Sequence, residues 1–128
     1  MPASPNARAA QLENRLIAFA VRIVRLANAL PKSFAGQHFG KQVLRSGTAP
    51  ALLYGEARGA ESDKDFRHKC SIALKELRET YINLKIIDQS DLLKTIRLDE
   101  LLDETNQLIS IFVRTVRTLD DRINQAKK

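Results

Sequence analysis

Residues that could support metal or acid–base chemistry gather in the middle of the chain. Asp65 and His68 have the acid–histidine spacing that di-iron helical bundles use. Such a site needs a second copy of the pair and further inward-facing carboxylates, and the sequence contains no second copy. Asp65 is better explained by the start of a helix, where the helix dipole favours negative charge. We therefore expect neither a metal nor a cofactor.

Cys70 is the single cysteine, and nucleophilic catalysis would need it exposed beside a base. It falls on an apolar stripe at helical spacing, so we expect a small buried hydrophobe. His68 points to another side of the helix, which prevents joint chelation. Glu76 and Glu79 lie among basic residues, and an acid–base pair would need a pocket that a tight bundle hardly offers. We expect no catalytic residue and no enzyme.

The segment Gly36–Lys41 has the composition of a phosphate-binding loop. Its spacing is one residue short, and Gln42 replaces the Ser or Thr that would hold magnesium. No strand is expected before it. We interpret the segment as a loop that leads into a helix.

Composition indicates one domain. The chain has 128 residues, of which 44% are hydrophobic, and it contains few Gly and Pro residues. No apolar run approaches the roughly 20 residues that span a bilayer, and no secretory signal is visible. A single cysteine forms no internal disulfide, which favours a reducing compartment. We expect a cytoplasmic protein that makes no membrane contact.

Hydrophobic periodicity predicts four helices. The third is the clearest: Ser62 is a candidate N-cap, and an apolar stripe recurs at steps of three or four residues from Phe66 through Leu77 to Ile87. Thr95 is the expected cap of the fourth helix. Short connections predict an all-α, antiparallel up-down-up-down four-helix bundle. The predicted helices span about 8–30, 38–59, 63–88 and 95–125, with flexible tails at 1–7 and 126–128.

Pro50 falls inside the second predicted helix, where it removes one backbone hydrogen bond and crowds the carbonyl of Ser46. We expect a kink near Pro50, with the hydroxyl of Ser46 or Thr48 satisfying the freed groups. A break of the helix near Thr48 is the alternative.

Positive charge is concentrated in the first half of the chain. The net charge is +6; residues 1–58 contain eight basic and two acidic residues, whereas residues 59–128 contain thirteen of each. Arginines repeat every seven residues along one flank of the first helix, and two cations lie one turn apart on the second. Such a surface favours sequence-tolerant binding of RNA or DNA. One alternative is that the charge only keeps the protein soluble. Another is that the arginines pair with acids of a neighbouring helix or subunit. The candidate nucleic-acid ligands are Arg8, Arg15, Arg22, Arg25, Lys41 and Arg45.

Several apolar residues lie off the core stripes. Soluble monomers rarely expose contiguous apolar patches, so we expect a homo-oligomer. The candidate interface residues are Ile17, Val21 and Val24 on the first helix, and Ile82 and Ile86 on the third.

The central segment resembles a known family. It is similar to small bacterial proteins found in intervening sequences of large-subunit ribosomal RNA genes. The matching residues are Glu56–Ser62, Asp65–Phe66, Lys69, Ala73–Glu76 and Glu79–Thr80, and upstream Leu44–Ser46 and Pro50–Ala51. The resemblance implies an antiparallel four-helix bundle that forms a homopentamer. It also implies basic relatives, the accessory variability determinants of diversity-generating retroelements, that bind nucleic acid and reverse transcriptase. Asn83 stands where the family often has an aromatic residue.

We therefore expect a non-enzymatic, oligomeric helical bundle that binds nucleic acid, or a nucleic-acid enzyme such as a reverse transcriptase, through a basic surface. A structural or protein-interaction module without nucleic-acid binding is the alternative.

Overall fold

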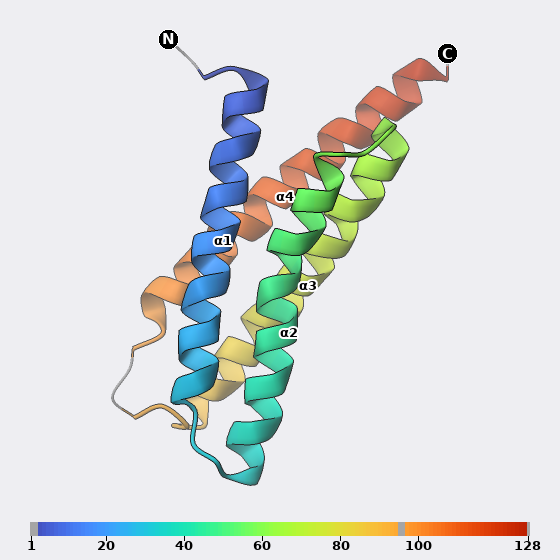
Figure 1. The fold of residues 1–128 in the computed structure, drawn as a ribbon. Coiled ribbons are helices and arrows are strands. Elements are labelled where there is room, and N and C mark those ends of the chain that lie inside the picture. The colour runs from blue at the N-terminus through green and yellow to red at the C-terminus, as the bar shows by residue number, and fades with distance from the viewer. Residues whose placement is uncertain (1–2, 95–96, 128) are drawn as a thin grey trace.

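A computed structural model of the protein describes residues 3–94 and 97–127. These residues form four α-helices and no strand, which confirms the all-α prediction (Figure 1). The helices are α1 (Pro5–Ala29), α2 (Phe34–Ala57), α3 (Asp63–Gln89) and α4 (Asp99–Ala126).

Serine caps explain where the helices start. The hydroxyl of Ser4 accepts a hydrogen bond from Ala7, so α1 starts at Pro5 rather than at about 8. Ser33 caps α2 through the amide of Gly36, so α2 starts at Phe34 rather than at about 38, and the segment interpreted as a loop is helical. Ser62 caps α3 as expected, accepting from the Asp65 amide at 3.1 Å. Thr95, the expected cap of the fourth helix, lies outside the described residues.

α2 continues through Pro50 without interruption, so the alternative of a break near Thr48 is wrong. The hydroxyl of Thr48 donates to the carbonyl of Leu44 at 2.7 Å and does not reach the carbonyl of Ser46, which Pro50 frees. The kink at Pro50 stays a prediction.

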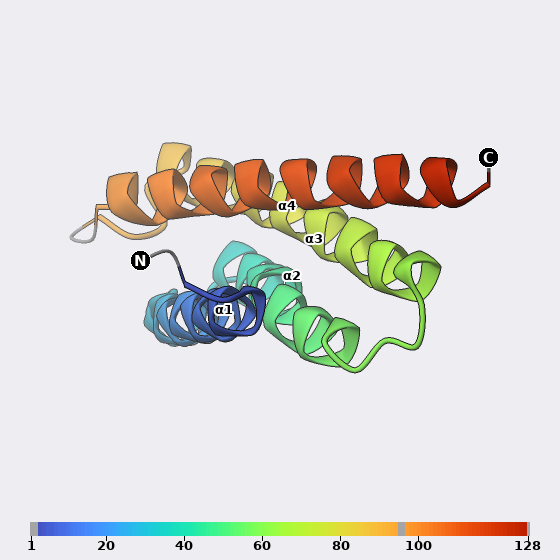
Figure 2. The ribbon, with the colours of Figure 1, turned by 90° about the horizontal axis from the view of Figure 1, so that it is seen from above.

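The four helices form two layers, with α1 and α2 in one and α3 and α4 in the other (Figure 2). α2 packs extensively on α3, α1 packs on α2, and α4 packs on α3, whereas α1 and α4 meet over a short stretch only. Figure 1 shows α4 leaning away from α1 toward the two chain ends. The bundle is therefore open between the start of α1 and the end of α4.

The core lies between the two layers and includes most of the apolar stripe predicted for the third helix, among it Leu77 and Ile87. Tyr54 meets Phe66 and Phe112 edge to face, with ring centroids 6.2 and 5.8 Å apart, and so connects α2 to α3 and α4. The largest fully buried apolar side chains are Leu16, Phe19, Ile23, Val43, Leu77, Leu84, Ile87, Leu98, Leu108 and Phe112.

Gly47 allows α2 to approach α1 closely. A Cβ atom at Gly47 would lie 2.7 Å from Cγ1 and 2.8 Å from Cγ2 of Ile23, which is closer than side-chain carbons pack. At Gly40, seven residues earlier on α2, a Cβ atom would make an ordinary contact, 3.6 Å from Leu30. Packing therefore requires glycine at position 47 but not at position 40.

These distances predict different outcomes for two otherwise matched substitutions. Alanine favours a helix over glycine by about 1 kcal/mol, so Gly40→Ala is expected to stabilise the fold or leave it unchanged. Gly47→Ala gains the same helix propensity but overpacks Ile23, at a cost of about 1–3 kcal/mol. Urea unfolding followed by circular dichroism measures both; equal free energies of unfolding for the two variants would contradict the close approach.

Candidate functional site

Arg15 is engaged in an ion pair within the subunit. Its guanidinium donates to Glu104 of α4 in a bidentate arrangement, Nε to Oε2 at 2.8 Å and Nη2 to Oε1 at 2.7 Å, and also to Gln107 at 2.7 Å. The hydrogen bond with Glu104 raises the pKa of Arg15, although burial opposes this change. The alternative that the stripe arginines pair with acids of the fourth helix therefore holds for Arg15.

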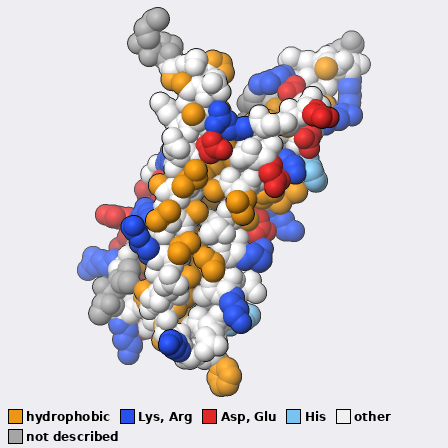
Figure 3. All heavy atoms as spheres, in the orientation of Figure 1, with side chains coloured by type: hydrophobic (Ala, Val, Ile, Leu, Met, Phe, Trp, Pro, Cys, Tyr) orange, Lys and Arg blue, Asp and Glu red, His pale blue; other side chains and the backbone are white. Residues whose placement is uncertain are grey.

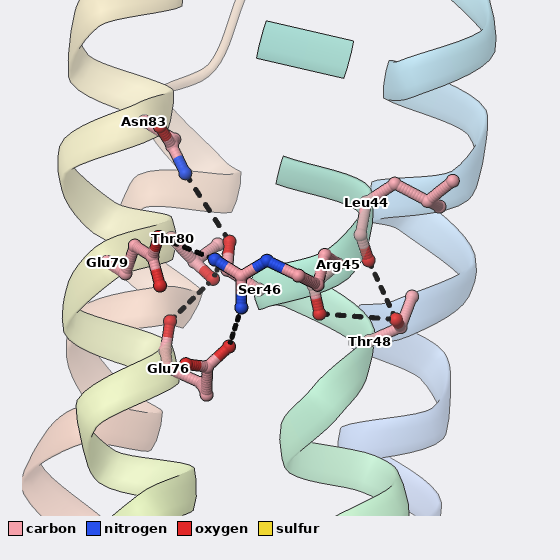
Figure 4. A network of polar contacts seen from close by, with 8 residues as sticks. All are labelled: Leu44, Arg45, Ser46, Thr48, Glu76, Glu79, Thr80 and Asn83. Atoms are coloured by element: carbon pink, nitrogen blue, oxygen red, sulfur yellow. Dashed lines mark hydrogen bonds and ion pairs between the residues drawn. The ribbon is translucent and has the colours of Figure 1, made fainter. Parts of the chain in front are cut away.

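Arg45 is likewise held, but by α3. Its Nη1 donates to Glu76 at 2.7 Å and its Nη2 donates to Glu79 at 2.6 Å (Figure 4). The hydrogen bond with Glu79, followed by the charge of Glu76, raises the pKa of Arg45. Glu76 and Glu79 of α3 are thus held in an intramolecular contact with α2.

The other four predicted ligands, Arg8, Arg22, Arg25 and Lys41, are exposed and make no ion pair with any residue in 3–94 or 97–127. They do not form one surface. Arg8 and Arg22 share the flank of Arg15, which faces α4, whereas Lys41 lies one turn from Arg45, which faces α3. The predicted basic face is therefore divided between two flanks of the bundle, with most of its free charge on α1.

A groove opens where α1 and α4 diverge. It has a volume of about 840 Å³ and contains Arg8 and Arg15 from α1 beside Arg114 and Arg122 from α4. The sequence analysis did not place Arg114 or Arg122 in a site. α1 begins and α4 ends at the same end of the molecule (Figure 1), so the arginines near the end of α4 lie beside the start of α1. This juxtaposition depends on tertiary structure.

Exposed apolar side chains form a second surface. On α1, Ile17, Val21 and Val24 retain 49%, 42% and 40% of their accessible area, and on α2 Leu44 and Leu52 retain 40% and 69%. We call these five residues the α1–α2 apolar face; Figure 3 shows apolar side chains gathered over both helices. Ile82 and Ile86, the other predicted interface residues, are 56% and 38% exposed on α3. Such exposure is compatible with burial against another subunit, and their role as an interface stays a prediction.

A buried polar layer joins α2 to α3 (Figure 4). The hydroxyls of Ser46 and Thr80 are 2.9 Å apart, and Asn83 donates to Ser46 at 3.4 Å. Every buried side-chain nitrogen or oxygen in the described part of the chain has a partner. The contacts of this layer are made between α2 and α3, so the layer specifies how the two helices pair.

Cys70 is fully buried, as expected, and burial raises the pKa of its thiol to about 12. His68 is exposed on the same helix. Within residues 3–94 and 97–127, no three His, Cys, Asp or Glu side chains lie close enough together to hold a metal ion. Nor do these residues contain a helix that is both long and apolar enough to cross a membrane.

Comparisons with known proteins agree on the family and the fold. The sequence profile described as 23S rRNA-intervening sequence protein matches residues 10–114. The chain is similar to a solved structure from Bacteroides thetaiotaomicron VPI-5482, described as a protein with unknown function from the S23 ribosomal protein family. The two are 29% identical with a TM-score of 0.75, and the similarity covers 81% of this chain and 96% of that one. No curated protein matches the chain.

The raised pKa of Cys70 predicts an inert thiol. At pH 9, a pKa of about 12 leaves on the order of one thiolate per thousand thiols, whereas an exposed cysteine with a pKa of about 8.5 is mostly thiolate. We expect iodoacetamide to modify the native protein far more slowly than the urea-unfolded protein. The control is Ser110→Cys, at an exposed position of α4, in a Cys70→Ala background. A native Cys70 that reacts as fast as this control would contradict the burial.

Proposed function

We propose that this chain is a non-enzymatic, homo-oligomeric helical bundle that binds RNA or DNA through the phosphate backbone. The chain belongs to the 23S rRNA-intervening sequence protein family, and the proposal proceeds from that membership.

Unpaired arginine side chains on α1 are the main support for nucleic-acid binding. Arg22 and Arg25 are exposed, lie one turn apart, and make no ion pair with any described residue. Three arginines from the first half of the chain do form ion pairs within the subunit. Arg15 pairs with Glu104, Arg45 with Glu76, and Arg58 with Glu13. Phosphates are attracted to such unpaired guanidinium groups without any reading of the bases.

Assembly would strengthen this attraction. The α1–α2 apolar face, with Ile82 and Ile86 on α3, offers surfaces through which copies of the chain associate. Repetition of α1 around a ring multiplies the positive field, which raises the local concentration of a polyanion. The number of subunits we propose, five, comes from the family resemblance alone.

A second candidate is a protein-interaction module. It is favoured by the pairing of Arg15 with Glu104 and of Arg45 with Glu76 and Glu79, which neutralises two of the six predicted phosphate ligands. In that case the partner is a protein, for which a nucleic-acid enzyme such as a reverse transcriptase is our candidate. The two functions differ in whether the purified protein binds RNA by itself.

The nucleic-acid proposal predicts a localised effect of charge reversal. Arg22→Glu with Arg25→Glu is expected to reduce affinity for a labelled RNA and to make the salt dependence less steep, because fewer counterions are released. Lys75→Glu with Arg78→Glu, at exposed positions of α3, makes the same change in net charge and is the control. The unmutated protein failing to bind at low salt, or both double variants losing affinity equally, would contradict the proposal.

The assembly proposal predicts dissociation when charge is placed on the apolar surfaces. Val21→Asp with Ile82→Asp is expected to yield monomers with unchanged helicity, measured by light scattering at micromolar concentration. Asn28→Asp with Gln89→Asp, at exposed polar positions of α1 and α3, is expected to leave the mass unchanged. A monomeric mass for the unmutated protein would refute assembly, whereas a dimer would refute only the pentamer.

A further inference from the structure

We propose that the groove between α1 and α4 is a docking site for an acidic amphipathic helix of a partner protein. The groove lies where the start of α1 and the end of α4 stand apart, near the two chain ends in Figure 1. The proposal goes beyond nucleic-acid binding. It adds Arg114 and an apolar floor that play no part in that proposal, whereas Arg8 is common to both.

The length of the groove fits a short helix. Its α1 wall runs from Pro5 to Arg15 and its α4 wall from Ile111 to Arg122. At 1.5 Å per residue these walls are each about 15 Å long, which corresponds to about three helical turns. The groove volume of about 840 Å³ falls within the range of roughly 300–1,000 Å³ that binding pockets occupy.

The floor of the groove is apolar. Leu12 of α1, Phe66 of α3 and Ile111 of α4 are partly exposed there, with Tyr54 and Leu119 buried beneath them. These side chains come from all four helices. Tyr54 belongs to the core, and Leu12, Phe66 and Ile111 pack against it, so the floor is preformed. A helix with an apolar stripe would remove the exposed side chains from water, as in other helix-in-groove complexes.

The rim of the groove is positively charged. Arg8 on the α1 wall and Arg114 on the α4 wall are exposed, and neither is ion-paired in the described part of the chain. Of the described acids, only Asp63 lines the groove, and it pairs with Arg122 at 3.4 Å. An occupant that carries acids on both sides of its apolar stripe would therefore meet a free arginine on each wall.

Two other occupants fit less well. A nucleic-acid strand would set its phosphates over the apolar floor. Tyr54 is buried there, which leaves Phe66 as the one partly exposed ring among the groove residues on which a base could stack. A second copy lacks a suitable segment among the described residues. The acidic start of α4 already buries its apolar side, Leu98 and Leu101, in its own core.

The test uses a fluorescent designed peptide about three turns long, with leucines on one face and glutamates on both flanks. A peptide of the same composition in scrambled order is the control for charge alone. We expect the amphipathic peptide to bind the full-length protein and to shift the methyl resonances of Leu12, Ile111 and Leu119.

Arg8→Glu with Arg114→Glu is expected to lower the affinity of the protein for this peptide about tenfold or more, since both rim contacts are reversed. Ile111→Ser, which changes only the floor, is expected to weaken binding without changing charge.

Arg22→Glu with Arg25→Glu is the matched control and is expected to leave peptide affinity unchanged, so that failure here and failure of RNA binding are distinguishable. The proposal is overturned if the amphipathic peptide fails to bind at about 1 mM, or if the scrambled peptide binds equally well. It is also overturned if RNA displaces the peptide from the groove and loses affinity with Arg114→Glu alone, since the groove is then a polyanion site. Dissociation of the assembly by Ile111→Ser would show instead that another copy covers the groove.

Discussion

The packing of α2 against α3 positions every other element of the molecule. Ser46, Thr80 and Asn83 are buried in this contact, and each polar atom needs its partner because an unpaired one would be costly away from water. A shift of one helix past the other would separate these partners. The polar layer therefore fixes the register, and Arg45 extends it to the surface through Glu76 and Glu79.

The central pair of helices, α2 and α3, separates the two outer helices, α1 and α4, from each other. α1 docks on α2, where Gly47 admits Ile23, and α4 docks on α3, so that the outer helices touch each other over a short stretch only. That contact includes the ion pair between Arg15 and Glu104. Beyond it the helices diverge, which leaves an apolar floor and unpaired arginines facing solvent. The same arrangement turns Ile17, Val21 and Val24 outward on the other side of α1.

Helical periodicity was sufficient to predict the four helices and most of the core, because a buried stripe such as Cys70, Leu77 and Leu84 repeats with the helix itself. The start of α2 was misplaced because Gly36 favours a loop, whereas the cap at Ser33 determines the boundary. The seven-residue spacing of arginines predicted that Arg8, Arg15 and Arg22 share one flank, and Arg8 and Arg15 line the same groove. It contained no information about Glu104, whose position opposite Arg15 depends on how α4 crosses the bundle. The groove depends on the same crossing, so neither Arg114 nor Arg122 was predicted to contribute.

Nucleic-acid binding, as we propose it, depends on the unpaired arginines of α1 rather than the ion-paired ones meeting the phosphate backbone. Arginine modification by phenylglyoxal, mapped by mass spectrometry with and without RNA, measures this dependence. We expect Arg22 and Arg25 to react readily in the free protein and to be protected by RNA, while Arg78 on α3 reacts equally in both states. Arg15 and Arg45 react slowly throughout because their guanidinium groups are held by carboxylates. Protection of Arg78 with Arg22 and Arg25 left unprotected would contradict this dependence.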